Sequence, residues 1–212
     1  MKYISEFIGS FFLVATVIGS GIMGVNMSAG NDAVALLGNT IATGAILFVL
    51  IKMFGSLSGA HFNPAVSMVF FLRKELDFKN LLFYIAYQIF GGILAVITIH
   101  YIFEIDIFQL STNIRGEIPL LVSEIIATNG LILTILFVRK NDENSIAIAV
   151  ALFITAGYWF TSSTSFANPM VTISRIFTDT FTGISFKSVP YFLVGQLIGV
   201  FISHLIYKQY EK

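Results

Sequence analysis

The residues best suited to act on another molecule are two Asn-Pro pairs that lie far apart in the chain. Asn63-Pro64 stands in the stretch AHFNPAVS, and Asn168-Pro169 stands in SFANPMVT. An asparagine amide group donates hydrogen bonds and its carbonyl oxygen accepts them, without carrying a charge. The chemistry that these residues offer is therefore hydrogen bonding to an uncharged molecule.

Other chemistries find little support in the sequence. The chain has no cysteine, which excludes disulfides and thiolate metal sites, and its three histidines lie far apart. An enzyme needs a nucleophile, a base or a metal constellation, so we expect no catalysis, no metal and no cofactor. The net charge is zero without a basic block, so we expect no nucleic-acid partner.

The composition indicates an all-α integral membrane protein. Of 212 residues, 56% are hydrophobic and only 11% are charged, whereas soluble domains carry about a quarter charged residues. A membrane helix needs about 20 apolar residues, and six stretches of the chain are long and apolar enough to cross the bilayer. We predict spans at 4–25, 34–56, 81–103, 118–138, 146–164 and 189–208.

Two further apolar segments, 64–73 and 169–179, are too short to span, and each begins at an Asn-Pro pair. Asparagine is a favoured N-cap and proline suits the first helical position. Non-helical backbone at membrane depth is tolerated only where it lines a cavity or is buried in protein. We therefore predict two re-entrant half-helices whose N-termini meet at the midplane.

The two halves of the chain resemble one another. Glu6 in SEFIGSFFLV matches Glu124 in SEIIATNGLIL, and Gln88 in YIAYQIFGG matches Gln196 in FLVGQLIGV. Each half holds three spans, an odd number, so the halves must insert with opposite topology. We predict one domain, 1–212, built from inverted repeats at about 1–105 and 117–212.

Positive charge in the connections predicts the orientation. Six crossings place both termini on one side, which receives eight of the eleven lysines and arginines that lie in the connections and at the termini. These eight are Lys2, Arg73, Lys74, Lys79, Arg139, Lys140, Lys208 and Lys212. We expect a multi-pass protein of the cell (inner) membrane with both termini in the cytoplasm.

Two facing half-helix N-termini would set the selectivity of the predicted pore. Each N-terminus carries roughly half a positive charge. Facing positive ends oppose cations and protons, while a neutral solute meets hydrogen-bond donors. The physical pattern thus predicts a passive pore for uncharged molecules.

The wording SGAHFNPAV, with six spans and a second Asn-Pro about a hundred residues later, resembles the aquaporin, or major intrinsic protein, family. The resemblance implies homotetramers with one pore per subunit. It assigns the pore motifs to Asn63, Pro64, Ala65, Asn168, Pro169 and Met170. Met170 departs from the usual alanine, and we expect it to change packing more than helix capping.

The resemblance also implies a four-residue selectivity filter, carried over by spacing from the two motifs to Thr43, Ala156, Ser165 and Val171. Water-selective members usually have bulky aromatic, histidine and arginine residues there. Small uncharged residues imply a wider constriction of the aquaglyceroporin kind. Such a filter would pass water, glycerol-like polyols, urea and neutral metalloid hydroxides.

The stretch YWFTSSTSFANPMVTISRIFTDTFTGI also resembles a bacterial branch of the family that is associated with arsenic resistance and likewise has valine at the filter position. This resemblance implies passage of arsenous acid or methylated arsenicals.

Arg175 lies four residues beyond Val171, on the same helical face. It could guard the outer vestibule as a displaced filter charge, in a channel that is strictly water-selective. Alternatively, it is a surface arginine that pairs with Asp179 or faces lipid headgroups. Tyr158 and Trp159, near the end of the fifth span, suit an interfacial aromatic belt.

Glu6 and Glu124 are acids near the start of spans. In a small inverted-repeat secondary transporter, the rival class, they could carry protons. The family resemblance instead implies that they are structural, accepting hydrogen bonds from backbone near the half-helices. It also places His61 on the cytoplasmic side of the pore, with Phe166 as its counterpart in the second half.

Overall fold

The computed structural model describes residues 1–211, which fold into helices joined by short connections. Six helices are long and apolar enough to cross a membrane, as predicted. They are α1 (Lys2–Met27), α2 (Asp32–Ser58), α4 (Phe78–Ile102), α5 (Ile118–Asn141), α6 (Ile146–Phe160) and α8 (Val189–Tyr210). Two short helices, α3 (Pro64–Leu72) and α7 (Pro169–Ser174), begin at the prolines of the Asn-Pro pairs.

Local residue types explain several helix ends. The Asn31 side chain accepts from the backbone N–H groups of Ala33 and Val34, which caps α2. Gly59 then ends α2, because its φ of +83° is a left-handed conformation that glycine adopts without strain. Asp77 caps α4 through the backbone N–H of Asn80.

Two predicted boundaries are wrong. α6 ends at Phe160, four residues before the predicted end, because Thr161 takes an extended conformation at the C-cap. α7 ends at Ser174 and continues only as a 3-10 turn, Arg175–Phe177, before Thr178 becomes extended. The second half-helix is therefore shorter than the predicted segment 169–179.

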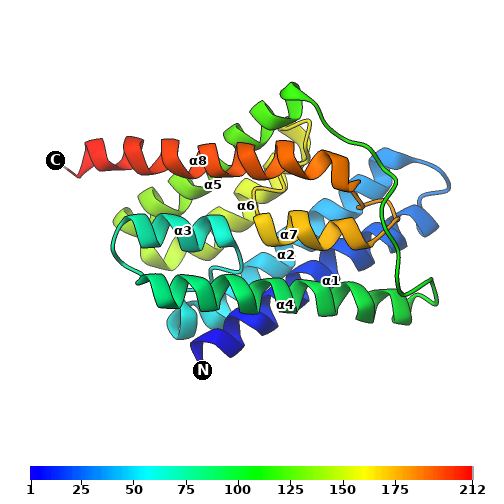
Figure 1. Cartoon of the computed structure of the whole chain (residues 1–212), viewed down its shortest axis with the longest axis horizontal. Coiled ribbons are helices and arrows are strands. Elements are labelled where there is room, and N and C mark those ends of the chain that lie inside the picture. The colour runs from blue at the N-terminus through cyan, green and yellow to red at the C-terminus, as the bar shows by residue number, and fades with distance from the viewer. Residues whose placement is uncertain (212) are drawn as a thin grey trace.

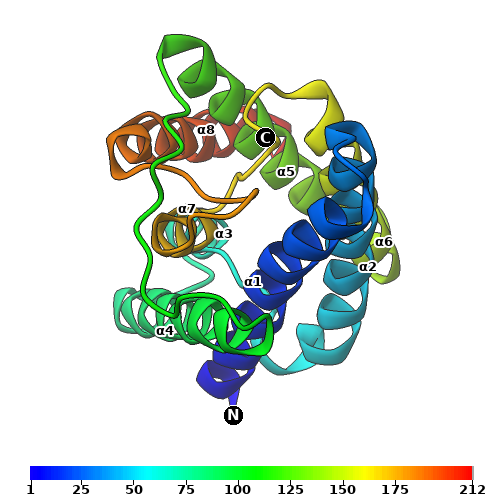
Figure 2. The same ribbon diagram turned by 90° about the vertical axis from the view of Figure 1, so that its right-hand side faces the viewer.

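The packing is the same in both halves. α1 packs against α2 and α4, α5 packs against α6 and α8, and α2 meets α6 between the halves. In Figure 1, α3 and α7 lie nearly end to end in the middle of the molecule, between α4 and α8. Figure 2 looks along the two half-helices and shows the longer helices around them. The fold is thus all-α, with six membrane helices and two re-entrant half-helices.

Close helix contacts depend on glycine at matching positions. A Cβ on Gly91 of α4 would lie 2.4 Å from the backbone oxygen of Phe7 in α1. A Cβ on Gly199 of α8 would lie 2.8 Å from the Cβ of Thr128 in α5. Small residues let membrane helices approach this closely.

The connection between α4 and α5 lies across the end of α7, along the right side of Figure 1, whereas both chain ends lie toward the left. The backbone N–H of Ser111 donates to the carbonyl of Ile176 at 2.9 Å. Further on, the backbone N–H of Arg115 donates to Ser188 Oγ at 2.8 Å. These bonds fix where the Arg115 side chain starts.

Candidate functional site

The two asparagines cap the half-helices and link the two halves. Asn63 Oδ1 accepts from the Ala65 N–H at 2.8 Å, and Asn168 Oδ1 accepts from the Met170 N–H at 3.0 Å. Asn63 Nδ2 donates to the carbonyl of Ala167 at 2.7 Å, and Asn168 Nδ2 donates to that of Phe62 at 2.9 Å. Each amide group keeps one further N–H for a solute.

The loops before the asparagines share an unusual backbone. Ala60 and Phe62 have φ values of +50° and +46°, and Ser165 and Ala167 have +48° and +46°. In each loop, the first of these residues lies three positions before the asparagine and the second lies directly before it. Left-handed conformations of such residues cost about 1–3 kcal/mol each and persist only where neighbouring contacts hold them.

Glu6 supplies those contacts in the first half. Its carboxylate is fully buried and accepts from the backbone N–H groups of His61 at 3.0 Å and Phe62 at 2.7 Å. It also accepts from Ser58 Oγ at 2.6 Å and Gln88 Nε2 at 2.8 Å. One side chain of α1 thereby fixes the loop that leads to Asn63.

Glu124 does the same in the second half. It is fully buried and accepts from the backbone N–H groups of Phe166 at 3.0 Å and Ala167 at 2.8 Å. Gln196 Nε2 donates to it at 2.6 Å. Within the described chain, neither Glu124 nor Glu6 borders the cavity described next.

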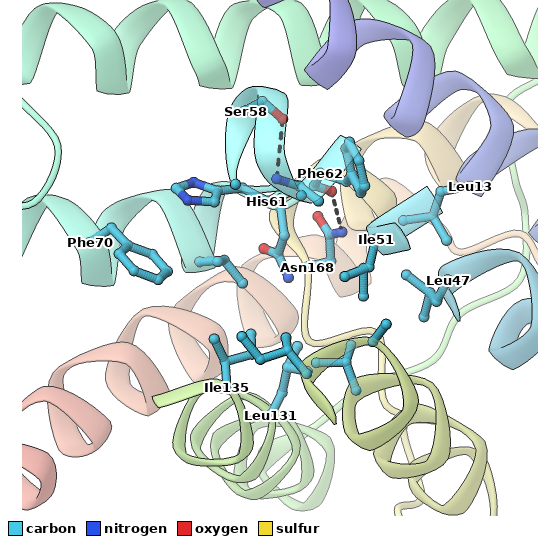
Figure 3. Close-up of a pocket in the computed structure, with 18 of the residues that line it drawn as sticks. Leu13, Leu47, Ile51, Ser58, His61, Phe62, Phe70, Leu131, Ile135 and Asn168 are labelled. Carbon is cyan, nitrogen blue, oxygen red and sulfur yellow. Dashed lines mark hydrogen bonds between the residues drawn. The ribbon is translucent and has the colours of Figure 1, made fainter. Parts of the chain in front are cut away.

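A cavity of about 770 Å³ runs past both asparagines. Part of its wall is polar and contains the side chains of His61 and Asn168 and the backbone at Phe62 (Figure 3). Aliphatic side chains line other parts of the cavity: in Figure 3, Leu131 and Ile135 lie across from His61 and Asn168, and Leu13, Leu47 and Ile51 lie to the right. The cavity thus offers hydrogen bonds on one side and apolar contact on the other.

His61 lies in the polar wall. Its ring stacks on Phe70, with centroids 4.7 Å apart, and Nδ1 lies 3.0 Å from Ser67 Oγ. Nε2 has no hydrogen-bond partner within residues 1–211 and is not fully enclosed. This nitrogen is therefore open to a solute.

Three of the four predicted filter residues border one end of the cavity: Thr43, Ser165 and Val171. The prediction for Ala156 is wrong, because that residue is exposed on the outside of α6. The cavity face of α6 instead carries Ala147, Val150, Ile154 and Tyr158, which recur with helical spacing. Two residues turn a helix by about 200°, so Ala156 faces away.

Tyr158 was missed by the sequence analysis as a site residue. It is buried, not interfacial, and its hydroxyl lies 3.2 Å from Thr43 Oγ1, which joins α6 to α2 at the end of the cavity. Trp159 is 51% exposed, as expected for a residue at a membrane surface. The spacing of four residues between Ile154 and Tyr158 was the sequence signal that could have placed both on one face of the helix.

Arg175 is only 4% exposed and borders the same end of the cavity. Its Nε donates to the carbonyl of Thr182, and its guanidinium carbon lies 3.6 Å from the centroid of the Phe166 ring. Asp179 does not pair with it and instead accepts from the Thr112 N–H at 2.8 Å. The alternative of a surface Arg175 paired with Asp179 is therefore wrong.

The opposite end of the cavity is lined by charged residues of several helices and of the connection before α4, among them Lys2, Lys52, Glu75, Asp77 and Arg139. No group of three or more potential metal-ligating side chains lies together within residues 1–211.

Several known proteins are similar to this chain in sequence or fold. The family model described as "Major intrinsic protein" matches residues 1–145. The aquaglyceroporin AqpS of Rhizobium meliloti (strain 1021) is 44% identical over 93% of this chain and 84% of its own length. The probable aquaporin NIP-type of Nicotiana alata is 31% identical over 97% of this chain and 77% of its own.

The X-ray structure of the aquaglyceroporin from Plasmodium falciparum has the same fold. It superposes with a TM-score of 0.76 at 24% identity and covers 97% of this chain and 94% of that one.

Proposed function

The chain belongs to the major intrinsic protein family and is a membrane channel for water and small solutes, and from this premise we propose that it passes uncharged solutes larger than water. These are glycerol-like polyols, urea and neutral metalloid hydroxides such as arsenous acid or methylated arsenicals. Flow is passive and follows the solute gradient.

The observation that carries this proposal is the end of the cavity at Thr43, Ser165 and Val171, where three small or medium uncharged side chains stand together. The two-sided lining supports it as well. A polyol has hydroxyl groups along one side and carbon-bound hydrogens along the other, which suit the asparagine wall and the aliphatic wall. The relative AqpS is named an aquaglyceroporin.

Exclusion of ions and protons follows from the half-helices. Both begin directly after asparagines that line the cavity, Asn63 and Asn168, so the positive helix ends and the remaining side-chain N–H of each asparagine are available to the solute. A cation would meet repulsion there, while a neutral oxygen acceptor gains hydrogen bonds.

The matched contacts of Glu6 and Glu124 support the further proposal that residues 1–105 and 117–212 are inverted repeats. We also propose a homotetramer in the inner membrane with both termini in the cytoplasm. In this orientation, the cavity end at Arg175 faces outward.

One alternative is a strictly water-selective channel. Arg175 and Tyr158 favour it, because both add bulk or charge at the same end as Val171. A secondary transporter is less well supported, because the carboxylates of Glu6 and Glu124 are occupied by backbone and glutamine donors.

Light scattering of proteoliposomes after osmotic shock separates these functions. Shocks with sucrose report water flow, and shocks with glycerol, urea and arsenous acid report solute entry. We expect glycerol and arsenous acid to enter well above empty liposomes. Passage of water alone would refute the wider constriction.

A matched variant sharpens the test. Val171→Arg adds charge and bulk at the constriction, so it should lower glycerol entry at least tenfold while reducing water flow less. Equal glycerol entry in the variant and the parent protein would show that Val171 does not lie at the narrowest point.

A further inference from the structure

The two ends of the cavity differ in how their arginines are paired. All three salt bridges within residues 1–211 lie at the end near α3, where Arg73 contacts Glu75 and Glu211, and Arg139 contacts Glu75. At the other end, Arg115 and Arg175 form no salt bridge with any residue of the described chain. We call this second end, formed by Arg115, Phe166 and Arg175, the arginine end.

Arg175 presents unused donors at the arginine end. Its Nε is held by the Thr182 carbonyl, but neither terminal nitrogen has a hydrogen-bond partner within residues 1–211. Neither nitrogen is fully enclosed, although the residue is only 4% exposed, and Arg175 lines the cavity. A guanidinium in this position offers a planar fork of N–H groups to an incoming oxygen pair.

Arg115 adds a second guanidinium from a different segment. Its carbon lies 5.6 Å from the centroid of the same Phe166 ring on which Arg175 stacks. Its terminal nitrogens donate only to Ser162 O at 3.1 Å and Thr164 Oγ1 at 3.4 Å, which are neutral. Arg115 does not border the main cavity of the described chain and is half-buried.

The acids of this region do not pair with the two guanidiniums of the described chain. The carboxylate of Glu124 accepts hydrogen bonds from the backbone N–H groups of Phe166 and Ala167 and from the side chain of Gln196. Asp179 accepts from Thr112. Neither acid forms a salt bridge with Arg115 or Arg175, and a buried guanidinium such as that of Arg175 is costly without a paired charge.

We propose that the arginine end binds a small oxyanion, held by the terminal N–H groups of Arg175 and attracted by Arg115. Arginine binds carboxylates and tetrahedral oxyanions through paired, charge-assisted hydrogen bonds. A bound oxyanion would stand beside Val171 and Tyr158 in the solute path. It therefore blocks neutral solutes, a consequence that rests on the proposed function.

Inorganic sulfate is the probe for this site, because it stays fully charged across the pH range of the assay. Isothermal titration of the detergent-solubilised full chain compares sodium sulfate with sodium chloride at equal ionic strength. We expect saturable sulfate binding to the parent protein, at least tenfold weaker binding to Arg115→Gln, and several-fold weaker binding to Arg115→Lys.

Lys187→Gln is the matched control. It removes one exposed positive charge from the connection before α8, which contributes no side chain to the Phe166 ring contacts. Sulfate binding should remain within twofold of the parent. Equal losses in Lys187→Gln and Arg115→Gln would show diffuse attraction and overturn the site.

Glycerol entry into proteoliposomes gives the second readout, with sulfate on both faces so that insertion direction does not matter. Sulfate should slow entry several-fold through the parent protein and Lys187→Gln, and much less through Arg115→Gln. Binding without any slowing would overturn the placement in the solute path. Sulfate binding to a protein that passes no glycerol would instead refute the proposed function and leave the site standing.

Discussion

The two loops that lead to Asn63 and Asn168 have the same backbone but different surroundings at the cavity ends. In each loop, the residue directly before the asparagine and the residue three positions before it take left-handed conformations. The backbone of each loop also donates hydrogen bonds to a buried glutamate. In the first half, however, His61 stacks on Phe70 near paired arginines, whereas in the second half Phe166 lies under the unpaired Arg175. The duplicated parts hold the backbone of the two loops, and the parts that differ line the cavity.

The same contrast appears in the packing behind the Asn-Pro pairs. Ala65 is small and belongs to a buried cluster with Val200 of α8. Met170 is large, and its sulfur would lie 2.7 Å from a Cβ on Gly92 of α4. In the first half the larger side chain of the pair, Val200, stands on the long helix α8. In the second half the larger side chain, Met170, stands on the half-helix α7 and faces Gly92 of the long helix α4.

Replacing the buried glutamates should have the largest effect. Glu6→Leu removes the acceptor of four hydrogen-bond donors, and Glu124→Leu removes that of three. Each buried donor left without an acceptor costs about 1–3 kcal/mol. We expect loss of folded protein in both, more complete for Glu6→Leu. Fluorescence-detected size exclusion in detergent measures this.

The glutamine variants are the controls, since Glu6→Gln and Glu124→Gln keep one acceptor oxygen and should retain more folded protein. If the leucine variants were as stable as the parent, the glutamates would not be holding the loops.

The exchange of volume between Met170 and Gly92 gives the next largest effect. Met170→Ala leaves a void at a fully buried site and should lower the free energy of unfolding by about 2–4 kcal/mol. Gly92→Ala alone crowds Met170 and Ser174 and should cost about 1–3 kcal/mol. The double variant should be more stable than Met170→Ala alone. Strictly additive losses in detergent denaturation would disprove the exchange.

Tyr158 and Ala156 test which face of α6 selects solutes. Tyr158→Ala opens the end of the cavity beside Thr43, so entry of a four-carbon polyol such as erythritol should rise several-fold relative to glycerol. Ala156→Leu changes a position exposed on the outside of α6 and should leave that ratio unchanged. A larger change for Ala156→Leu would restore the sequence-based filter. Light scattering with both polyols measures the ratio.

The paired end should show a small acid dependence of stability. Burial raises the pKa of Glu75, but hydrogen bonds from Arg139 and Arg73 outweigh it and hold that pKa below its usual value. The hydrogen bond from Arg73 likewise lowers the pKa of Glu211. A lowered pKa in the folded state gives stability that is complete above the unfolded value, about 4.3, and is lost as the pH falls through the folded one.

Glu75→Gln should therefore lower Tm at pH 6, by an amount equivalent to less than about 1 kcal/mol, and the difference should disappear near pH 3. Arg115→Gln, at the unpaired end, should show no such convergence. An offset for Glu75→Gln that persists at pH 3 would contradict the ion-pair origin.

Much of this molecule is determined by the sequence alone, because the signals are local. Runs of about 20 apolar residues predict the six spans, which the structure confirms to within a few residues except at the end of α6. Asn63-Pro64 and Asn168-Pro169 carry their own helix-start chemistry and predict where α3 and α7 begin. Matching glutamates and glutamines predict that the halves correspond.

Only the tertiary structure decided which side chains meet at the arginine end. Gap-free spacing from the second Asn-Pro motif selected Ala156, because the sequence of the irregular stretch 161–168 does not reveal which face of α6 points toward the cavity. The position of Arg175 depended on the early end of α7 and on contacts with Phe166 and Thr182, which lie outside that helix. Helix formation is decided between neighbours in sequence, whereas burial and the pairing of charges are decided by contacts between distant segments.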